Sequence, residues 1–267
     1  MDEVSNSRRF AEQRLKEVYE CIEERKSVDV EELVQIFGVS GATIRSDLRE
    51  LEKRELITRT HGGAIARDNG VIKDRNLDPA YKSRMELNIG SKEKIGMAVA
   101  KLIRDDESIM LDDGTTTLQV ANFLPKGKRL TIITNDINIC IKLADLESVE
   151  IISTGGIFRN RDLSYSGKIA EETTRKFYAN KAILGASGVS LEKGITAPEE
   201  LKAELKKVMI ANCAEVVIVA DSTKLERVSL LPVCEIGRVT TLVTDAGAPK
   251  AFVEQIEKKG VRVIIAE

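Results

Sequence analysis

Residues 39–45 read Val-Ser-Gly-Ala-Thr-Ile-Arg, and residues 61–64 read His-Gly-Gly-Ala. In the first stretch, Ser40 is placed to cap a helix that carries Ile44, Leu48 and Leu51 at spacings of four and three. The second stretch follows the strand-like residues 56–60 and contains the two glycines of a tight turn. Together the two stretches predict a helix followed by a β-hairpin.

Two more helices are predicted before this one. Residues 8–25 carry apolar side chains three or four positions apart, which indicates a helix with one buried face. Asp29 is a suitable N-cap for the next helix, with Glu32 as its capping-box partner, and Gly38 is suited to end that helix. Three helices and a hairpin predict a winged helix-turn-helix domain over residues 1–66.

The rest of the chain has a different pattern. Residues 67–88 show no clean periodicity, so we expect a linker there, with a short helix at about residues 81–87. From residue 89 to residue 267, helical stretches alternate with short apolar strands, which predicts an α/β domain with a largely parallel sheet. The expected strands are residues 108–111, 130–134, 150–153, 182–185, 216–220, 241–244 and 262–265.

Composition limits the kinds of site the chain can hold. The 267 residues are 42% hydrophobic and 31% charged, which suits one large or two ordinary globular domains. Cys21, Cys140, Cys213 and Cys234 lie too far apart for a metal-binding motif, and the single histidine argues against a His-based metal site or triad. We therefore expect no metal and no cofactor.

The sequence also bears on location. The N-terminus lacks the apolar core of a signal peptide, and no apolar run approaches the roughly 18 residues that span a bilayer. A cytoplasmic protein without membrane contact is the expectation.

The helix that begins near Ser40 corresponds to the recognition helix of a helix-turn-helix, whose first residues meet base edges in the major groove. Arg45 is suited to a bidentate contact with guanine, and Thr43 offers both a hydroxyl and a methyl group. Lys53 and Arg54 are suited to phosphate. The predicted DNA-contacting residues are Ser40, Gly41, Ala42, Thr43, Arg45, Ser46, Arg49, Arg59, His61, Gly62 and Gly63.

Charge gives mixed support to this interpretation. Residues 1–68 contain 12 Lys and Arg against 15 Asp and Glu, whereas residues 40–67 contain 6 against 4. The acidic residues concentrate between Glu17 and Glu32, on helices that can face away from DNA, so the expected footprint is a local basic stripe. On charge alone, a helical domain that packs against a protein remains an alternative.

Small, polar or glycine-rich residues follow five of the predicted strands. Open parallel sheets bind ligands outside the carboxyl ends of their strands. Residues 113–117, Asp-Gly-Thr-Thr-Thr, open a helix whose backbone amides suit a phosphate, although such loops are also simple helix caps. The predicted ligand-binding residues are Asp113, Gly114, Thr115, Thr116, Thr117, Thr134, Asn135, Gly155, Gly156, Gly185, Ser187, Lys206, Asp221 and Lys224, with Arg159 as an auxiliary candidate.

Residues 14–66 resemble the DeoR family of bacterial transcriptional regulators. The family pattern V-x-E-L-x-x-x-F-x-V-S-x-x-T-I-R-x-D-L-x-x-L-E is matched in register from Val30 to Glu52, and R-x-H-G-G-A follows from residue 59. Two departures are Ser46, where the family usually has a second arginine, and Glu55, where glycine is common. The resemblance implies a DNA-binding regulator.

The C-terminal half resembles the DeoR-type sensor domain and also ribose-5-phosphate isomerase. The likeness to the isomerase lies in residues 94–96, the Gly-Thr-Thr loop at 114–116 and residues 217–224. The isomerase carries catalytic acids in an Asp-Gly-Ala-Asp-Glu stretch, but residues 184–189 here read Leu-Gly-Ala-Ser-Gly-Val and contain no carboxylate. Isomerisation needs a base beside the carbonyl, so the resemblance implies a sugar-phosphate sensor and not an enzyme.

The sequence thus predicts a transcriptional regulator, and specifically a repressor, of sugar-metabolism genes. We expect a homo-oligomer, at least a dimer, that binds double-stranded operator DNA and is controlled by a phosphorylated sugar or related metabolite. One alternative is an isomerase-like enzyme with a DNA-binding appendage, which would have to use Asp112, Asp113 or Glu204. Another is an oligomeric scaffold that uses the helical domain for protein contacts.

Overall fold

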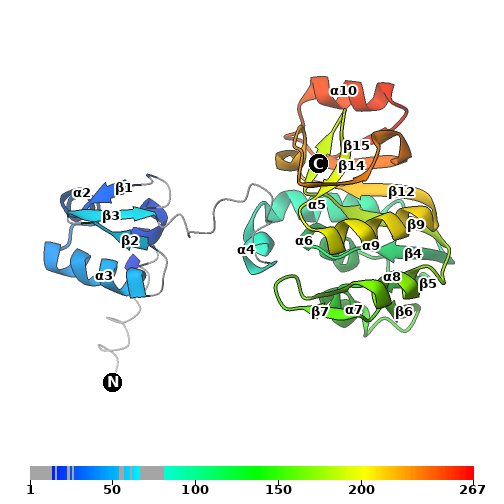
Figure 1. Cartoon of the computed structure of the whole chain (residues 1–267), viewed down its shortest axis with the longest axis horizontal. Helices are drawn as coiled ribbons and strands as arrows, with labels where there is room; N and C mark the ends of the chain where they lie inside the picture. Colours follow the sequence, from blue (N-terminus) through cyan, green and yellow to red (C-terminus); the bar gives the residue numbers. More distant parts are fainter. Residues whose placement is uncertain are drawn as a thin grey trace. The chain divides into compact units, whose positions relative to one another are not determined.

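The computed structural model describes residues 14–15, 17–22, 25, 27–53, 57–60, 62–66 and 81–267. The chain divides into two compact units, residues 1–74 and 75–267 (Figure 1). Some predictions fall outside the described residues: the start of the first helix, Arg54, Glu55, His61 and the linker before residue 81.

The N-terminal unit contains the predicted helices. Residues 14–25 are helical wherever they are described, and α2 (Val30–Phe37) and α3 (Gly41–Lys53) follow. The capping box of α2 is confirmed, because the Glu32 amide donates to Asp29 Oδ1 at 2.8 Å and the Asp29 amide donates to Glu32 Oε2 at 3.3 Å. The helices share one apolar core, which includes Val18, Ile22, Leu33, Ile44, Leu48 and Leu51.

The hairpin belongs to a small antiparallel sheet. Among the described residues its order is β1 (Ser27–Asp29), β3 (Gly63–Ala66), β2 (Ile57–Arg59). The sequence predicts β2 and β3 but not β1, because three residues carry no periodicity and β1 gains its hydrogen bonds from β3, a strand distant in the chain. Val28 of β1 is buried in the core and so joins the sheet to the helices.

In the C-terminal unit, residues 81–267 contain a seven-stranded sheet in which neighbouring strands pair in parallel. Each of the seven strands predicted there is confirmed, with ends shifted by at most a few residues. In spatial order they are β15 (Arg262–Ala266), β14 (Thr241–Asp245), β12 (Cys213–Val219), β9 (Ala179–Gly185), β4 (Glu107–Leu111), β5 (Leu130–Thr134) and β6 (Val149–Ser153).

Helices cover both faces of this sheet (Figure 1). Side chains of one strand alternate between the faces, so Val217 and Val219 of β12 join one core while Val216 and Ile218 join the other. The first core includes α5 (Ile89–Ala100), α6 (Thr115–Asn122) and α7 (Ile137–Leu143), and the second includes α8 (Lys168–Thr174), α9 (Glu200–Ala211) and α10 (Lys250–Lys258). None of the described helices is long and apolar enough to cross a membrane.

Short elements that the sequence does not predict surround the sheet. The exception is α4 (Tyr81–Glu86), which falls where a short helix is predicted. Each of the others is only three or four residues long, too short to carry a periodic pattern. They are β7 (Ile157–Arg159) with β8 (Ser164–Ser166), and β10 (Gly188–Ser190) with β11 (Gly194–Ala197) and β13 (Leu231–Cys234), together with the 3-10 turns η1 (Ser222–Lys224) and η2 (Ile236–Arg238).

The direction of strand addition reverses between β4 and β9. From β4 the chain adds β5 and β6 on one side, and from β9 it adds β12, β14 and β15 on the other. The connections that leave β4 and β9 run over opposite faces of the sheet, since α6 and α9 belong to different cores. This is the position at which open α/β sheets bind ligands, outside the carboxyl ends of the two strands.

Gly63 tests the architecture of the small sheet. A Cβ at this position would lie 2.2 Å from the Val28 carbonyl oxygen, whereas a Cβ at Gly62 would meet nothing within 4 Å. We expect Gly63→Ala to lower the free energy of unfolding of the N-terminal unit by about 1–3 kcal/mol through overpacking, and Gly62→Ala to change it by less than about 0.5 kcal/mol. Calorimetric unfolding of the full chain measures both, and equal effects would contradict the β1–β3 contact.

Candidate DNA-binding surface and ligand site

The predicted recognition helix is α3, and its first turn is exposed. Ser40, Ala42, Arg45, Ser46 and Arg49 are exposed, while Gly41 and Thr43 are half-buried. Ser40 Oγ accepts from the Thr43 amide at 3.2 Å and lies 2.9 Å from Thr43 Oγ1, which confirms the predicted cap. The cap fixes the start of the helix, and the exposed side chains of this turn face outward from the core.

One carboxylate anchors the opposite side of α3. Asp47 is buried and accepts from Arg14 in a bidentate arrangement, with Arg14 Nε at 2.7 Å and Nη2 at 3.1 Å. This pair ties the recognition helix to the first helix. Asp47 is therefore a structural residue, and it leaves the outward face of α3 to the basic side chains.

The hairpin residues have more local roles than the sequence suggests. The Gly63 amide donates to Thr60 Oγ1 at 3.1 Å and is buried, while Gly62 is exposed. The Arg59 amide donates to Glu52 Oε1 at 3.3 Å, and its guanidinium lies 3.6 Å from Glu52 Oε2. Gly63 thus shapes the turn, and Arg59 meets a carboxylate of α3 in the same unit.

At the β4–β9 edge, Asp112 and Lys206 form a buried ion pair. The Gly185 amide donates to Asp112 Oδ2 at 3.0 Å, and Lys206 Nζ donates to the Gly185 carbonyl at 3.0 Å. Burial raises the pKa of Asp112 to about 6, although Lys206 acts in the opposite direction. Lys206, predicted as a ligand-binding cation, is thus engaged with Asp112.

The next carboxylate, Asp113, is enclosed by polar groups. Its oxygens accept from Asn135 Nδ2 at 3.2 Å and from Ser164 Oγ at 3.3 Å. Burial alone would raise the pKa of Asp113, but the positive charges of Lys202, Lys206 and Arg84 hold it below its ordinary value. Asp113 is therefore an ionised acceptor in the middle of the site.

Asp136 connects the loops after β4 and β5. It caps α7 by accepting from the Asn138 amide at 2.7 Å, and its other oxygen accepts from the Gly114 amide at 3.1 Å. Burial, followed by the charge of Asp113, raises the pKa of Asp136 to about 6. The start of α6 is thus fixed from the neighbouring strand.

The amino ends of α5 and α6 lie together at this edge. A Cβ on Gly96 would lie 2.7 Å from the Gln119 backbone, so the two helices pack closely there. Both helices run antiparallel to the strands. Lys92 lies one turn before Gly96 in α5, and Thr115 lies one turn before Gln119 in α6. No side chain among the described residues caps either helix at its N-cap position.

Lys92 is a candidate ligand-binding residue that sequence reasoning missed. It is buried, and its pKa is lowered by burial and by the charges of Lys224 and Arg84, while Asp221 opposes that shift. Its ammonium donates to the carbonyl oxygens of Arg84 and of Leu87, the latter at 2.5 Å. A lysine within an amphipathic pattern gives no sign of burial, so only the fold identifies it.

Several predicted residues instead make contacts within their own loops. Thr117 Oγ1 donates to the Gly114 carbonyl at 2.9 Å, and Thr134 Oγ1 accepts from the Asp136 amide at 3.1 Å. Gly156 lies against the Ser166 carbonyl, and Gly155 precedes it in the β6–β7 turn. The Ser187 amide donates to the Thr196 carbonyl at 3.2 Å.

The remaining predicted residues lie at the β12 end and in the first turn of α6. Asp221 accepts from Asn88 Nδ2 at 3.4 Å and caps η1, while Lys224 is half-buried, with no ion pair to any described residue. Thr115 is buried and Thr116 half-buried. Lys92 is buried beside this group, since the charges of Asp221 and Lys224 both act on it.

A further buried carboxylate, Asp162, was not predicted. It lies between β7 and β8 and accepts from Lys202 Nζ at 2.7 Å and from Arg84 Nη2 at 3.0 Å. Arg159, the auxiliary candidate, pairs with Glu199 and lies 3.5 Å from Asp162. The hairpin that presents Asp162 has no sequence signal, which is why Asp162 and its partners Lys202 and Arg84 were not predicted.

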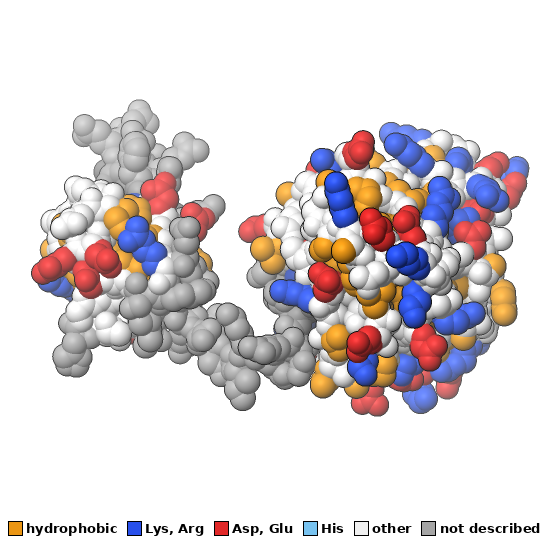
Figure 2. All heavy atoms as spheres, turned by 90° about the horizontal axis from the view of Figure 1, so that it is seen from above, with side chains coloured by type: hydrophobic (Ala, Val, Ile, Leu, Met, Phe, Trp, Pro, Cys, Tyr) orange, Lys and Arg blue, Asp and Glu red, His pale blue; other side chains and the backbone are white. Residues whose placement is uncertain are grey.

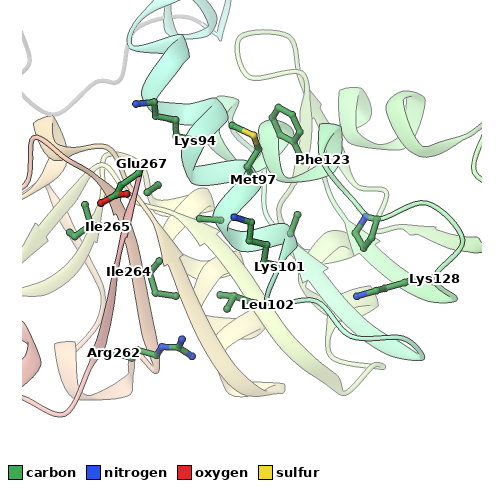
Figure 3. Close-up of a pocket in the computed structure, with 14 residues that line it drawn as sticks. Lys94, Met97, Lys101, Leu102, Phe123, Lys128, Arg262, Ile264, Ile265 and Glu267 are labelled. Atoms are coloured by element: carbon green, nitrogen blue, oxygen red, sulfur yellow. The ribbon is translucent and has the colours of Figure 1, made fainter.

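A separate groove of about 770 Å³ lies elsewhere on the C-terminal unit (Figure 3). It runs between α5 and β15, and none of the predicted ligand-binding residues lines it. Four basic side chains and several apolar ones surround it: Lys94, Lys101, Lys128 and Arg262, with Met97, Phe123 and Ile265 among the apolar residues. On the face of this unit shown in Figure 2, acidic and basic side chains are interspersed.

Two family descriptions match the chain. A DeoR-like helix-turn-helix domain matches residues 14–69, and the DeoR C terminal sensor domain matches residues 87–246. The chain belongs to the DeoR family. The resemblance inferred from the sequence is thereby confirmed for both halves.

Curated relatives cover nearly the whole chain. An uncharacterized HTH-type transcriptional regulator YulB of Bacillus subtilis is 34% identical, over 94% of this chain and 95% of that protein. A putative aga operon transcriptional repressor of Escherichia coli O157:H7 is 30% identical, over 95% and 93%. The glycerol-3-phosphate regulon repressor of Escherichia coli K12 is 31% identical, over 91% and 94%.

Solved structures give a more distant likeness. Ribose 5-phosphate isomerase A of Methanocaldococcus jannaschii is 17% identical, with a TM-score of 0.37, over 52% of this chain and 55% of that one. The relatives named above are regulators or repressors and not enzymes. This DeoR-family protein is accordingly a DNA-binding transcriptional regulator.

The raised pKa of Asp136 has a consequence for stability. A carboxyl group with a higher pKa in the folded state contributes stability at low pH that is lost as pH rises through the folded pKa, here about 6. Asp136→Asn cannot titrate. We expect the wild type to lose about 2 kcal/mol relative to this variant between pH 4 and pH 7. Urea unfolding across this range measures the difference, and parallel stability curves would contradict the assignment.

Proposed function

We propose that this DeoR-family regulator represses a carbohydrate-metabolism operon and that a phosphorylated sugar bound at the β4–β9 edge controls it. The domain arrangement that we propose is DNA binding in residues 1–66, a linker at 67–88, and ligand binding with oligomerisation in residues 89–267. Two relatives, named as repressors of the aga operon and of the glycerol-3-phosphate regulon, support this class of target.

The observation that carries the ligand proposal is the convergence of cationic and amide groups at one edge of the sheet. The amino ends of α5 and α6 lie side by side without a side-chain cap, and the backbone amides there suit an anion. Lys92 and Lys224 are close enough for the charge of Lys224 to lower the pKa of Lys92. A bound phosphate would offset this repulsion.

The catalytic alternative has little support at this edge. Asp112 is held by Lys206 and the Gly185 amide, and Glu204 pairs with Lys207 at 2.8 Å on the opposite side of α9 from the buried Lys206. Residues 184–189 supply no carboxylate. Binding without turnover is what a sensor requires.

Control of DNA binding then follows from linkage. A ligand changes operator affinity only if it binds two conformations or assemblies with different affinities. Operator half-sites are read by symmetric pairs of recognition helices, so a homo-oligomer, at least a dimer, fits this scheme.

Arg45 tests the DNA-binding surface. Its exposed side chain at the start of α3 is suited to a base contact, and that of Arg49, one turn later, to a phosphate contact. We expect Arg45→Ala to weaken binding to the preferred operator by about 1–3 kcal/mol and to relax one base preference. Arg49→Ala should weaken binding to all DNA sequences equally. It should also reduce the slope of log affinity against log salt concentration by about one. Gel shifts against operators selected from a random library measure affinity and base preference. If Arg45→Ala left both unchanged, the proposed base contact of Arg45 would be refuted.

Lys92 tests the ligand site. We expect one or more phosphorylated sugars to stabilise the full chain by about 2.7 kcal/mol at a hundred times the dissociation constant. Lys92→Met should abolish most of that stabilisation, because it removes a buried cation from the phosphate position. Lys94→Met, an exposed neighbour on α5, is the matched control. Thermal-shift measurements report both, and no shift of the wild type by any sugar phosphate would overturn the proposed function.

A further inference from the structure

Helix α4 is the first described element after the segment that follows the DNA-binding unit, and it is fastened to the ligand edge at several points. The Tyr81 amide donates to the Arg161 carbonyl at 3.2 Å, and Arg84 Nη2 donates to Asp162 at 3.0 Å. At the other end of α4, Lys92 donates to the carbonyl oxygens of Arg84 and Leu87. The lysine proposed to hold phosphate therefore also holds α4.

Two side chains of α4, those of Tyr81 and Arg84, lie near the buried carboxylates of this edge. The Tyr81 side chain is 5% exposed, and the charges of Asp136 and Asp113 act on its hydroxyl. The guanidinium of Arg84 lies 5.8 Å from the centre of the Tyr81 ring, and its charge acts on Asp113. Tyr81 and Arg84 thus reach the same group of residues as the strand-end loops.

Buried polar atoms in this neighbourhood have no hydrogen-bond partner among the described residues. They include Tyr81 Oη, Asn135 Oδ1 and Ser166 Oγ. Asn135 also donates to Asp113, and Ser166 lies on the same side of β8 as Ser164, whose hydroxyl donates to Asp113. A buried polar group without a partner is unfavourable, so several around one carboxylate point to a polar ligand.

We propose that α4 forms one wall of the effector site, with Tyr81 and Arg84, together with Lys202 of α9, binding the hydroxyl-bearing end of a phosphorylated sugar. This inference rests on the proposed function, in which the phosphate lies at the amino end of α6. The ligand then contacts directly the helix that leads from the DNA-binding unit.

The chemistry of these groups selects hydroxyls and not a second anion. Asp113 and Asp162 are buried acceptors, and Asn135 offers a free carbonyl oxygen beside them, so a second phosphate or carboxylate would meet like charge. A sugar hydroxyl donates to such acceptors and accepts from a phenol, an ammonium or a guanidinium. The number and placement of hydroxyls on the sugar thus become the specificity signal.

Tyr81→Phe tests the inference, because it removes one oxygen atom and retains the packed ring. Isothermal titration of the full chain would use glucose 6-phosphate, galactosamine 6-phosphate, glycerol 3-phosphate and inorganic phosphate as probes. For the tightest sugar phosphate, we expect the variant to bind about tenfold more weakly than wild type. Affinity for inorganic phosphate should be unchanged. Tyr178→Phe, at a tyrosine that is 76% exposed, is the matched control.

Hydrogen exchange supplies a second readout. Saturation with the same sugar phosphate should slow exchange of the amides of residues 81–86 severalfold, and inorganic phosphate should slow them less. The amides of α10, which lies outside this edge, provide the internal reference. Arg84→Lys keeps the charge and should retain part of this protection.

The outcomes separate the two proposals. If wild type binds none of the sugar phosphates, the proposed function fails and this inference fails with it. If wild type binds one of them but Tyr81→Phe binds it equally well and α4 exchange is unchanged, the inference alone is overturned. Weakened binding by Tyr81→Phe together with protection of α4 supports it.

Discussion

Burial of carboxylates at the carboxyl ends of β4 and β5 is the constraint on which the C-terminal unit depends. Asp112, Asp113 and Asp136 are each nearly inaccessible to solvent, and Asp162 joins them from the β7–β8 hairpin. An ionised group taken out of water needs compensating charges and hydrogen bonds nearby. The chain supplies them from α9 and α4 and from backbone amides of neighbouring loops. These requirements bring both layers of helices to the same edge of the sheet.

The DNA-binding unit solves a simpler problem. Among its described residues, a partly buried ion pair between Arg14 and Asp47 lies on the inner side of α3, and the core that the helices share is apolar. The two units thus use charge differently. Around α3, basic side chains lie at the surface. Around β4, charged groups are buried and paired, so that a change in one of them alters many contacts.

Features set by neighbouring residues were predictable from the sequence. The Asp29–Glu32 capping box, the left-handed Gly38 and the seven apolar strands all arise from patterns a few residues long. The contacts of Asp162 were not predictable in this way, because its partners Arg84 and Lys202 are 78 and 40 positions away. Asp112 and Lys206 are separated by 94 positions. Such pairs depend on the order of strands, which periodicity does not encode.

Because such long-range contacts are not encoded in local patterns, the candidate ligand-binding residues were only partly identifiable from the sequence. The loops at 113–117 and 221–224 follow strands and so were found by the rule for parallel sheets. That rule treats every polar side chain there as available, whereas Thr117, Thr134 and Lys206 are engaged by their neighbours. Lys92 and Tyr81 precede the sheet in sequence and carry no comparable signal.

The Asp112–Lys206 pair also bears on how such a sensor can evolve. A carboxylate introduced at Ser187 would join an edge where Asp112, Asp113 and Asp136 are already buried, and Lys206 is already paired with Asp112. Adding that charge without a further cation would destabilise the fold. A catalytic carboxylate at this edge therefore requires coordinated substitutions, and a single replacement of Ser187 would not supply one.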